Sequence, residues 1–163
     1  AAQVRDLRQY GFILLTKLAE MNEEILNRIR NEIDGDTREY LLNCKNNYSE
    51  YTDAAIILFP EYYSNIENQL EIEKEFNKAI KFKESGDFDS ELSILISLIE
   101  RKASAPAIYK RAASLYYKQK EFEKSKEVFI KWFDYGYWKI PNMATSSLLF
   151  LDKLELHMKS KKS

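Results

Sequence analysis

The chain of 163 residues contains one cysteine, Cys44, and one histidine, His157. A single cysteine excludes an intramolecular disulfide, and one cysteine and one histidine in distant segments do not have the ligand spacing of a zinc site. Only four glycines and three prolines are present, whereas the turns of a sheet protein of this length usually require more of both. This scarcity favours an all-α fold.

Long hydrophobic runs are also absent. The run from Gly11 to Leu15 is far shorter than the ~20 apolar residues that a membrane-spanning helix requires, so we expect no membrane span. The chain begins Ala-Ala-Gln, which is compatible with a processed product, with or without a signal peptide, or with part of a longer chain. The single cysteine agrees with a cytoplasmic location, and an exported or periplasmic protein is the alternative.

Charge of one sign does not dominate, because the net charge is −1. The two halves nevertheless differ: residues 1–71 carry 7 basic and 13 acidic side chains, whereas residues 72–163 carry 18 basic and 13 acidic ones. These halves could attract each other, present two differently charged surfaces, or form one mixed solvated surface. With 45% hydrophobic residues the composition is that of a folded protein.

Two stretches of the chain match at a spacing of 34 residues. The shared positions are Ala79, Phe82, Gly86, Phe88, Leu95 and Leu98 in the first stretch, and Ala113, Tyr116, Lys120, Phe122, Phe129 and Trp132 in the second. Each stretch predicts a helix, a short turn and a second helix. The predicted helices are Phe76–Ser85, Phe88–Arg101, Ala107–Gln119 and Phe122–Phe133.

The residue types at these positions have a physical logic. Ala113 is small, so that the two helices of a pair can approach closely, and Phe129 fills the groove to the next pair. We expect Tyr116 and Phe122, which flank the turn, to pack on each other. Gly86 stands where a helix must end, because glycine tolerates the left-handed cap conformation.

The second stretch resembles the tetratricopeptide repeat family. Its matching residues are Tyr109, Ala112, Ala113, Tyr116, Phe122, Ser125 and Phe129. The first stretch departs from the pattern at Glu75, Lys78 and Glu91, and a terminal helix, Met143–Lys159, matches with Ser146, Ser147 and Phe150. The resemblance covers a little over half of the chain and implies a right-handed array of antiparallel helical hairpins, an α-solenoid, ending in a capping helix.

The first seventy residues do not repeat convincingly. Apolar residues at helical spacing predict a long amphipathic helix over Val4–Ile33 and a second helix over Thr37–Phe59, before Pro60. A third helix is predicted from Glu61 into the first repeat, which gives about seven helices in total. We therefore divide the chain into an N-terminal helical segment, 1–71, and a repeat domain, 72–163. The long first helix either packs within the chain or pairs with a second copy.

The sequence contains few patterns that are typical of a catalytic or cofactor-binding site. Cys44 would need a neighbouring base to act as a nucleophile, and the sequence places none. The paired acids are better explained as helix-end turn residues than as metal ligands, and the chain has no phosphate-binding glycine loop. These pairs are Glu23 with Glu24, Asp34 with Asp36, and Asp87 with Asp89. We predict no enzyme, no metal and no cofactor.

Nucleic-acid binding is disfavoured. Lysines surround Tyr109, Tyr116 and Tyr117, a mixture that suits phosphates and stacked bases. Glutamates interleave with these lysines at spacings that suit ion pairs along a helix, and the tyrosines fall on the packing positions of the repeat.

The family resemblance instead implies a binding groove for another protein or peptide. In the family the first helix of each hairpin lines the concave face. The matching residues here are Phe76, Asn77, Ile80, Lys83, Lys110, Arg111, Ser114, Tyr117 and Lys118, with Ala144, Thr145, Leu148 and Leu151 from the terminal helix. The family's clamp for a C-terminal carboxylate is disfavoured, because Leu42 and Ala107 stand at its two lysine positions. The basic middle of the groove suits a segment with an acidic residue.

The terminal helix is apolar on nearly every side, so we expect the N-terminal region, a second subunit or a partner to cover it. Trp132, Tyr135 and Trp138, together with Leu148 and Leu151, could form an interface or belong to the core. The sequence therefore predicts a non-catalytic binding scaffold or adaptor. The alternatives are an assembly subunit, such as a homodimer joined through the terminal helix, and a small secretion chaperone of the tetratricopeptide type.

Overall fold

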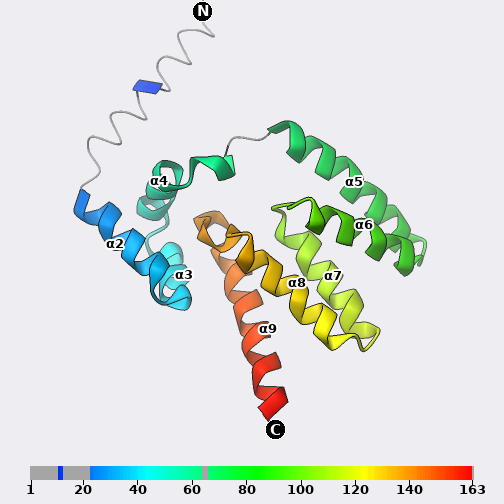
Figure 1. Cartoon of the computed structure of the whole chain (residues 1–163). Coiled ribbons are helices and arrows are strands. Elements are labelled where there is room, and N and C mark those ends of the chain that lie inside the picture. The colour runs from blue at the N-terminus through cyan, green and yellow to red at the C-terminus, as the bar shows by residue number, and fades with distance from the viewer. Residues whose placement is uncertain (1–10, 13–22, 64–65, 163) are drawn as a thin grey trace, which may run out of the picture.

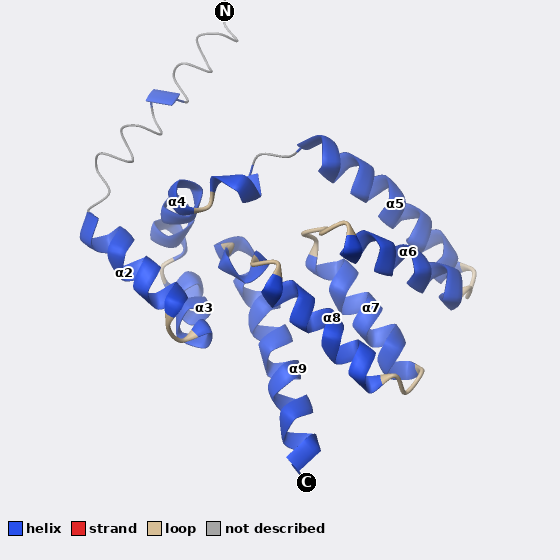
Figure 2. Cartoon of the chain, viewed as in Figure 1, coloured by secondary structure: helices blue, strands red, loops and turns tan. Residues whose placement is uncertain are grey.

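A computed structural model describes residues 11–12, 23–63 and 66–162 of the chain. Over this part the protein is all-α, and Figure 2 shows helices joined by short loops. From Glu23 onward, the described part of the chain contains eight α-helices in succession: α2 Glu23–Asp34, α3 Thr37–Asn46, α4 Tyr48–Leu58, α5 Ile66–Glu84, α6 Phe88–Glu100, α7 Pro106–Lys118, α8 Phe122–Asp134 and α9 Ala144–Lys162. Short 3₁₀ turns lie at Pro60–Tyr63, Tyr137–Lys139 and Pro141–Met143.

The N-terminal half corrects one prediction. The helix expected over Thr37–Phe59 is two helices, α3 and α4, which meet at Asn47. Asn47 has φ −128° and ψ 52°, and it ends α3 while it begins α4. Asparagine favours such positions because its side chain competes for backbone hydrogen bonds within a helix. The predicted long helix over Val4–Ile33 is described only at residues 11–12 and from Glu23 onward, so most of it lies outside the described residues.

The four helices of the two matching stretches form two successive antiparallel pairs, α5 with α6 and α7 with α8 (Figure 1). Helix α6 also packs on α7, so the pairs lie against each other. The observed bounds agree with the predicted ones to within one or two residues at each end, except at the start of α5. That helix begins at Ile66, ten residues before Phe76 and five after Glu61, where a helix running into the first stretch was predicted.

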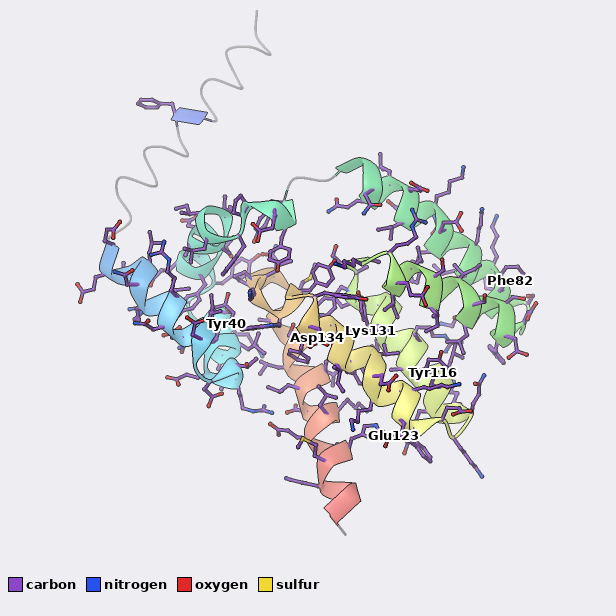
Figure 3. The ribbon with its side chains drawn as sticks, in the orientation of Figure 1. Tyr40, Phe82, Tyr116, Glu123, Lys131 and Asp134 are labelled. Carbon is purple, nitrogen blue, oxygen red and sulfur yellow. The ribbon has the colours of Figure 1, made fainter. Side chains whose placement is uncertain are left out.

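The turns within the two pairs have the same backbone geometry. Gly86 has φ +79°, and Lys120, 34 residues later, has φ +63°. The amide of Asp87 donates to the Phe82 carbonyl at 2.9 Å, and the amide of Glu121 donates to the Tyr116 carbonyl at the same distance. Figure 3 labels Phe82 and Tyr116 at these two helix ends. The predicted left-handed cap at Gly86 is therefore confirmed.

The main core lies between α5, α6, α7, α8 and α9. Tyr109 and Trp132 are fully buried there, and their ring centroids are 5.0 Å apart. Trp132 also contacts Phe150 of α9 edge-on at 5.5 Å. Aromatic contacts of this kind add specific geometry to the burial of large apolar areas.

A second cluster joins the N-terminal helices to α9. Tyr40 and Leu41 of α3 are buried in it, and the Tyr40 hydroxyl donates to the carbonyl of Lys139 at 2.5 Å. Figure 3 labels Tyr40 at this junction. Arg38 of α3 forms ion pairs with Asp152 and Glu155 of α9 at 2.9 and 2.8 Å. The N-terminal region thus covers one face of the terminal helix, which was one of the three possibilities left open by the sequence.

Candidate binding groove

A groove of about 560 Å³ lies between α7, α8 and α9, and we call it the α7–α9 groove. Among the described residues, its lining comes from these three helices alone: Lys110, Ala113, Ser114, Tyr117 and Lys118 of α7, Ser125 and Phe129 of α8, and Leu149, Phe150, Lys153, Leu156 and His157 of α9. The positions on α7 follow the spacing i, i+3, i+4, i+7 and i+8. This spacing places them on one face of the helix.

The floor of the groove is buried and tightly packed. Ala113, Ser125, Phe129 and Phe150 are all at most 6% exposed. The Ser125 hydroxyl donates to the carbonyl of Ala113 at 2.8 Å, which requires the close approach of α7 and α8 that a small residue at position 113 predicted. The rings of Phe129 and Phe150 lie 4.9 Å apart, so that α8 and α9 meet beneath the groove.

The walls expose apolar surface to solvent. Tyr117 is 60% exposed on the α7 side, and Leu156 is 62% exposed on the α9 side. The ring of Phe122 supports Tyr117 edge-on at a centroid distance of 5.0 Å. The predicted contact of Phe122 with Tyr116 is therefore corrected: the turn brings Tyr117 to Phe122, whereas Tyr116 faces α6.

The rim of the groove is basic. Lys110 and Lys118 lie on the α7 wall and Lys153 lies on the α9 wall, while no carboxylate is among the described residues that line the groove. Each wall spans nine residues, from Lys110 to Lys118 and from Leu149 to His157, and the eight steps between its ends correspond to about 12 Å of helix. An apolar floor with positive charges on both sides suits a ligand that combines apolar and acidic groups.

Of the nine binding residues predicted on the first helices of the two hairpins, four lie together in this groove: Lys110, Ser114, Tyr117 and Lys118. Four others, Phe76, Asn77, Ile80 and Lys83, lie on α5, which contributes no side chain to the groove. Phe76 is half-buried against the main core, and Asn77 is exposed.

Arg111 points away from the groove to a buried partner. Its guanidinium Nε and Nη2 donate to the two carboxylate oxygens of Glu91 at 2.7 and 3.0 Å. The Glu91 side chain is 2% exposed, and that of Arg111 is 19% exposed. This bidentate pair raises the pKa of Arg111. The unusual glutamate of α6 is thereby matched by the arginine of α7, which joins the two helix pairs.

The terminal helix presents a face that the family pattern did not indicate. Leu149, Lys153 and Leu156 line the groove, whereas the predicted Leu148 and Leu151 are half-buried against the N-terminal cluster. Of the remaining predicted positions, Ala144 is buried in that cluster and Thr145 is exposed. The packing of α3 sets this rotation of α9, and a comparison of repeats carries no information about α3.

The aromatic residues proposed as an interface or as core lie within the protein. Trp132 is fully buried, and its indole Nε1 donates to the Ser147 hydroxyl at 2.9 Å. Tyr135 and Trp138 are half-buried against the main core, and Trp138 also packs on the N-terminal cluster. In the structure these aromatic side chains therefore belong to the core, which is one of the two interpretations that the sequence left open.

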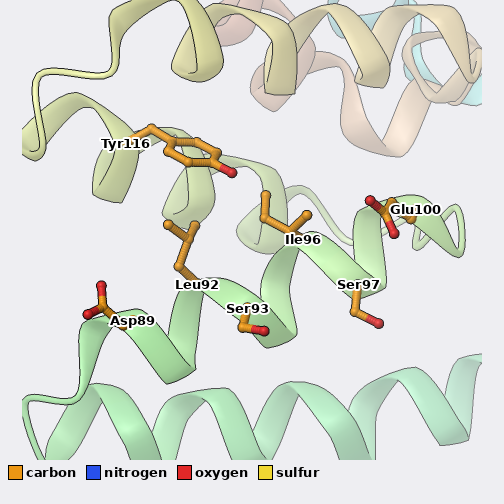
Figure 4. Close-up of a pocket in the computed structure, with 7 residues that line it drawn as sticks. All are labelled: Asp89, Leu92, Ser93, Ile96, Ser97, Glu100 and Tyr116. Atoms are coloured by element: carbon orange, nitrogen blue, oxygen red, sulfur yellow. The ribbon is translucent and has the colours of Figure 1, made fainter.

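A second, shallower hollow of about 500 Å³ lies along α6 (Figure 4). Leu92 and Ile96 point from α6 toward Tyr116 of α7, while Asp89 and Glu100 stand at its two ends. This hollow is acidic where the α7–α9 groove is basic. It has fewer apolar side chains in its lining, so we take the α7–α9 groove as the candidate site.

Of the single cysteine and the single histidine, only His157 lines the groove, and Cys44 lies elsewhere. Cys44 is fully buried, and burial raises the pKa of its thiol to about 12, which keeps it in the unreactive neutral form at pH 7. Within the described part of the chain, no group of three or more acidic, histidine or cysteine side chains is placed to hold a metal ion.

None of the helices that the structure describes combines the length and the apolar character needed to cross a bilayer. Comparison of the chain with protein-family models, with curated proteins and with solved structures gave no match in any of the three.

Proposed function

We propose that this protein is a non-catalytic scaffold that holds a segment of another polypeptide in the α7–α9 groove. The observation that carries the proposal is the lining of the groove. It combines a buried apolar floor, the exposed Tyr117 and Leu156, and three lysines without an opposing carboxylate. Such a surface favours an apolar segment with acidic side chains over a neutral or basic one.

The repeated turn geometry supports the finer interpretation that the two helix pairs are tetratricopeptide-like and that α9 is the first helix of a third, incomplete unit. Under this interpretation the groove lies on the concave face of a short right-handed α-solenoid. The similar left-handed φ values at Gly86 (+79°) and Lys120 (+63°), 34 residues apart and with matching hydrogen bonds around them, support this interpretation.

The test is photo-crosslinking in extract of the source cells, with a benzoyl-phenylalanine placed at Tyr117. We expect a specific polypeptide to crosslink from this position and none to crosslink from Phe88, which is also exposed but lies on α6. Crosslinking should be lost in the triple variant Lys110→Glu, Lys118→Glu, Lys153→Glu. It should be kept in the charge-matched control Lys45→Glu, Lys74→Glu, Lys81→Glu, whose lysines are exposed outside the groove.

If the groove variant crosslinks as well as the control does, the groove is not the binding site.

One further observation favours an assembly role as the alternative function. Met158, on a different side of α9 from the groove, is 61% exposed near the end of that helix. Sedimentation of the full chain separates the two functions, because an assembly subunit would be a stable oligomer without any added partner.

A further inference from the structure

We infer that the ligand of the α7–α9 groove is an amphipathic α-helix of another protein, with acidic residues along both edges of its apolar face. This inference rests on the proposed function and specifies the class of partner. It follows from three properties of the groove: the scarcity of hydrogen-bonding groups in its floor, its length and exposed walls, and the distribution of its charges.

The floor of the groove does not suit an extended chain. An extended segment carries backbone N–H and C=O groups that require hydrogen-bond partners when they are buried. The floor consists of Ala113, Phe129 and Phe150 with one hydroxyl, that of Ser125, which already donates to the Ala113 carbonyl. A helix satisfies its own backbone groups and presents only side chains to such a floor.

The dimensions of the groove fit one face of a short helix. Each wall is about 12 Å long, and apolar residues at positions i, i+3, i+4 and i+7 of a ligand helix would span about 10 Å. The two walls are open to solvent, since Tyr117 is 60% exposed and Leu156 is 62% exposed. The groove therefore accepts the apolar side chains of a helix that lies along it, and the opposite face of that helix stays in solvent.

The charges specify the edges of the ligand helix. Lys110 and Lys118 stand on one wall and Lys153 stands on the other, so that carboxylates on both sides of the apolar stripe would meet lysines. A second copy of this chain docked symmetrically, groove against groove, would instead place the same lysines opposite one another. Like charges in such an interface oppose association, so the charge pattern favours a different, acidic protein.

The experiment uses three synthetic 16-residue peptides and the full chain, with binding measured by fluorescence anisotropy at low salt. The first peptide is an amphipathic helix with leucines at i, i+3, i+4 and i+7 and glutamates on both edges. The second has a proline at its centre, and the third has lysines in place of the glutamates. We expect the acidic helix to bind, the proline peptide to bind about 100-fold more weakly, and the basic peptide not to bind.

The variants assign the binding to the groove. The triple variant Lys110→Glu, Lys118→Glu, Lys153→Glu should lose the acidic helix, and the control Lys45→Glu, Lys74→Glu, Lys81→Glu should keep it. Equal affinity for the acidic helix and its proline form would overturn the helical ligand. So would self-association of the full chain that only the groove variant abolishes, because a second copy would then be the occupant.

The two proposals fail in different ways. If position 117 crosslinks a cellular protein but the acidic helix does not bind at concentrations up to about 1 mM, the helical ligand is wrong and the binding scaffold stands. If crosslinking is insensitive to the groove variant, the scaffold proposal itself is wrong.

Discussion

The buried ion pair between Glu91 and Arg111 allows a sharp test of how the two helix pairs are joined. We predict that Arg111→Met destabilises the protein by about 3 kcal/mol, because it leaves the Glu91 carboxylate, which is 2% exposed, without its cationic partner. We take the lower end of the usual range for breaking a buried pair, since the Arg111 side chain retains 19% exposure and part of the interaction is screened by solvent.

The reverse change should cost less. In Glu91→Gln the guanidinium of Arg111 loses its anionic partner, but it can reach water and still lies 5.8 Å from the centre of the Phe88 ring. We expect a loss of about 1–2 kcal/mol. The double variant Glu91→Leu, Arg111→Met removes both charges from the interface and should lie within about 1 kcal/mol of the wild-type protein, because apolar packing replaces the pair.

The measurement is the free energy of unfolding in urea, followed by the helical circular dichroism signal. A cost below about 1 kcal/mol for Arg111→Met would contradict the reasoning, as would a double variant that is less stable than either single one. The result also shows why Arg111 is unsuitable for a binding test. Reversing the charge of Arg111 would place two carboxylates together between α6 and α7, so a loss of binding in such a variant would report on folding.

Three further changes test the fold. Ala113→Leu should overpack the contact at which Ser125 bonds the 113 carbonyl, and it should cost roughly 1–3 kcal/mol in urea unfolding. Lys120→Gly should stabilise the protein by about 1 kcal/mol, because φ at this position is +63° and glycine adopts it without strain; a lower melting temperature would refute this. Between pH 9 and 12 the free energy of unfolding should fall as the pH rises. The pKa of the Cys44 thiol is raised to about 12 in the folded protein, so the unfolded chain loses that proton at lower pH than the folded one does. The variant Cys44→Ala should therefore show a smaller fall over this pH range.

The sequence was informative wherever local rules decide the structure. The 34-residue spacing located both helix pairs, and Gly86 marked a helix end that the structure confirms. Ala113 correctly indicated a close approach of two helices. These features depend on contacts between residues less than one repeat apart, and each has a signature in a few consecutive positions.

Prediction failed where the decisive contact is distant in the sequence or weak in pattern. The break at Asn47 lies within a helical apolar pattern, and only the preference of asparagine for helix ends could have indicated it. The pairing of Glu91 with Arg111 joins residues 20 positions apart. In the sequence, Glu91 was read as a departure from the family pattern and Arg111 as a residue of the groove, and nothing linked the two. On the α7 side, four of the residues that line the groove, Lys110, Ser114, Tyr117 and Lys118, coincide with positions predicted from the family pattern.

The α9 side of the groove was missed for a physical reason that also bears on function. A helix in the middle of an array is held on both sides by similar neighbours, but α9 has α8 on one side and α3 on the other. Arg38 bonds Asp152 and Glu155, and Tyr40 bonds the Lys139 carbonyl just before α9. These contacts half-bury Leu148 and Leu151 and turn Lys153 and Leu156 toward α7. The N-terminal helices therefore do not occupy the groove in the described part of the chain; they set the orientation of one of its walls.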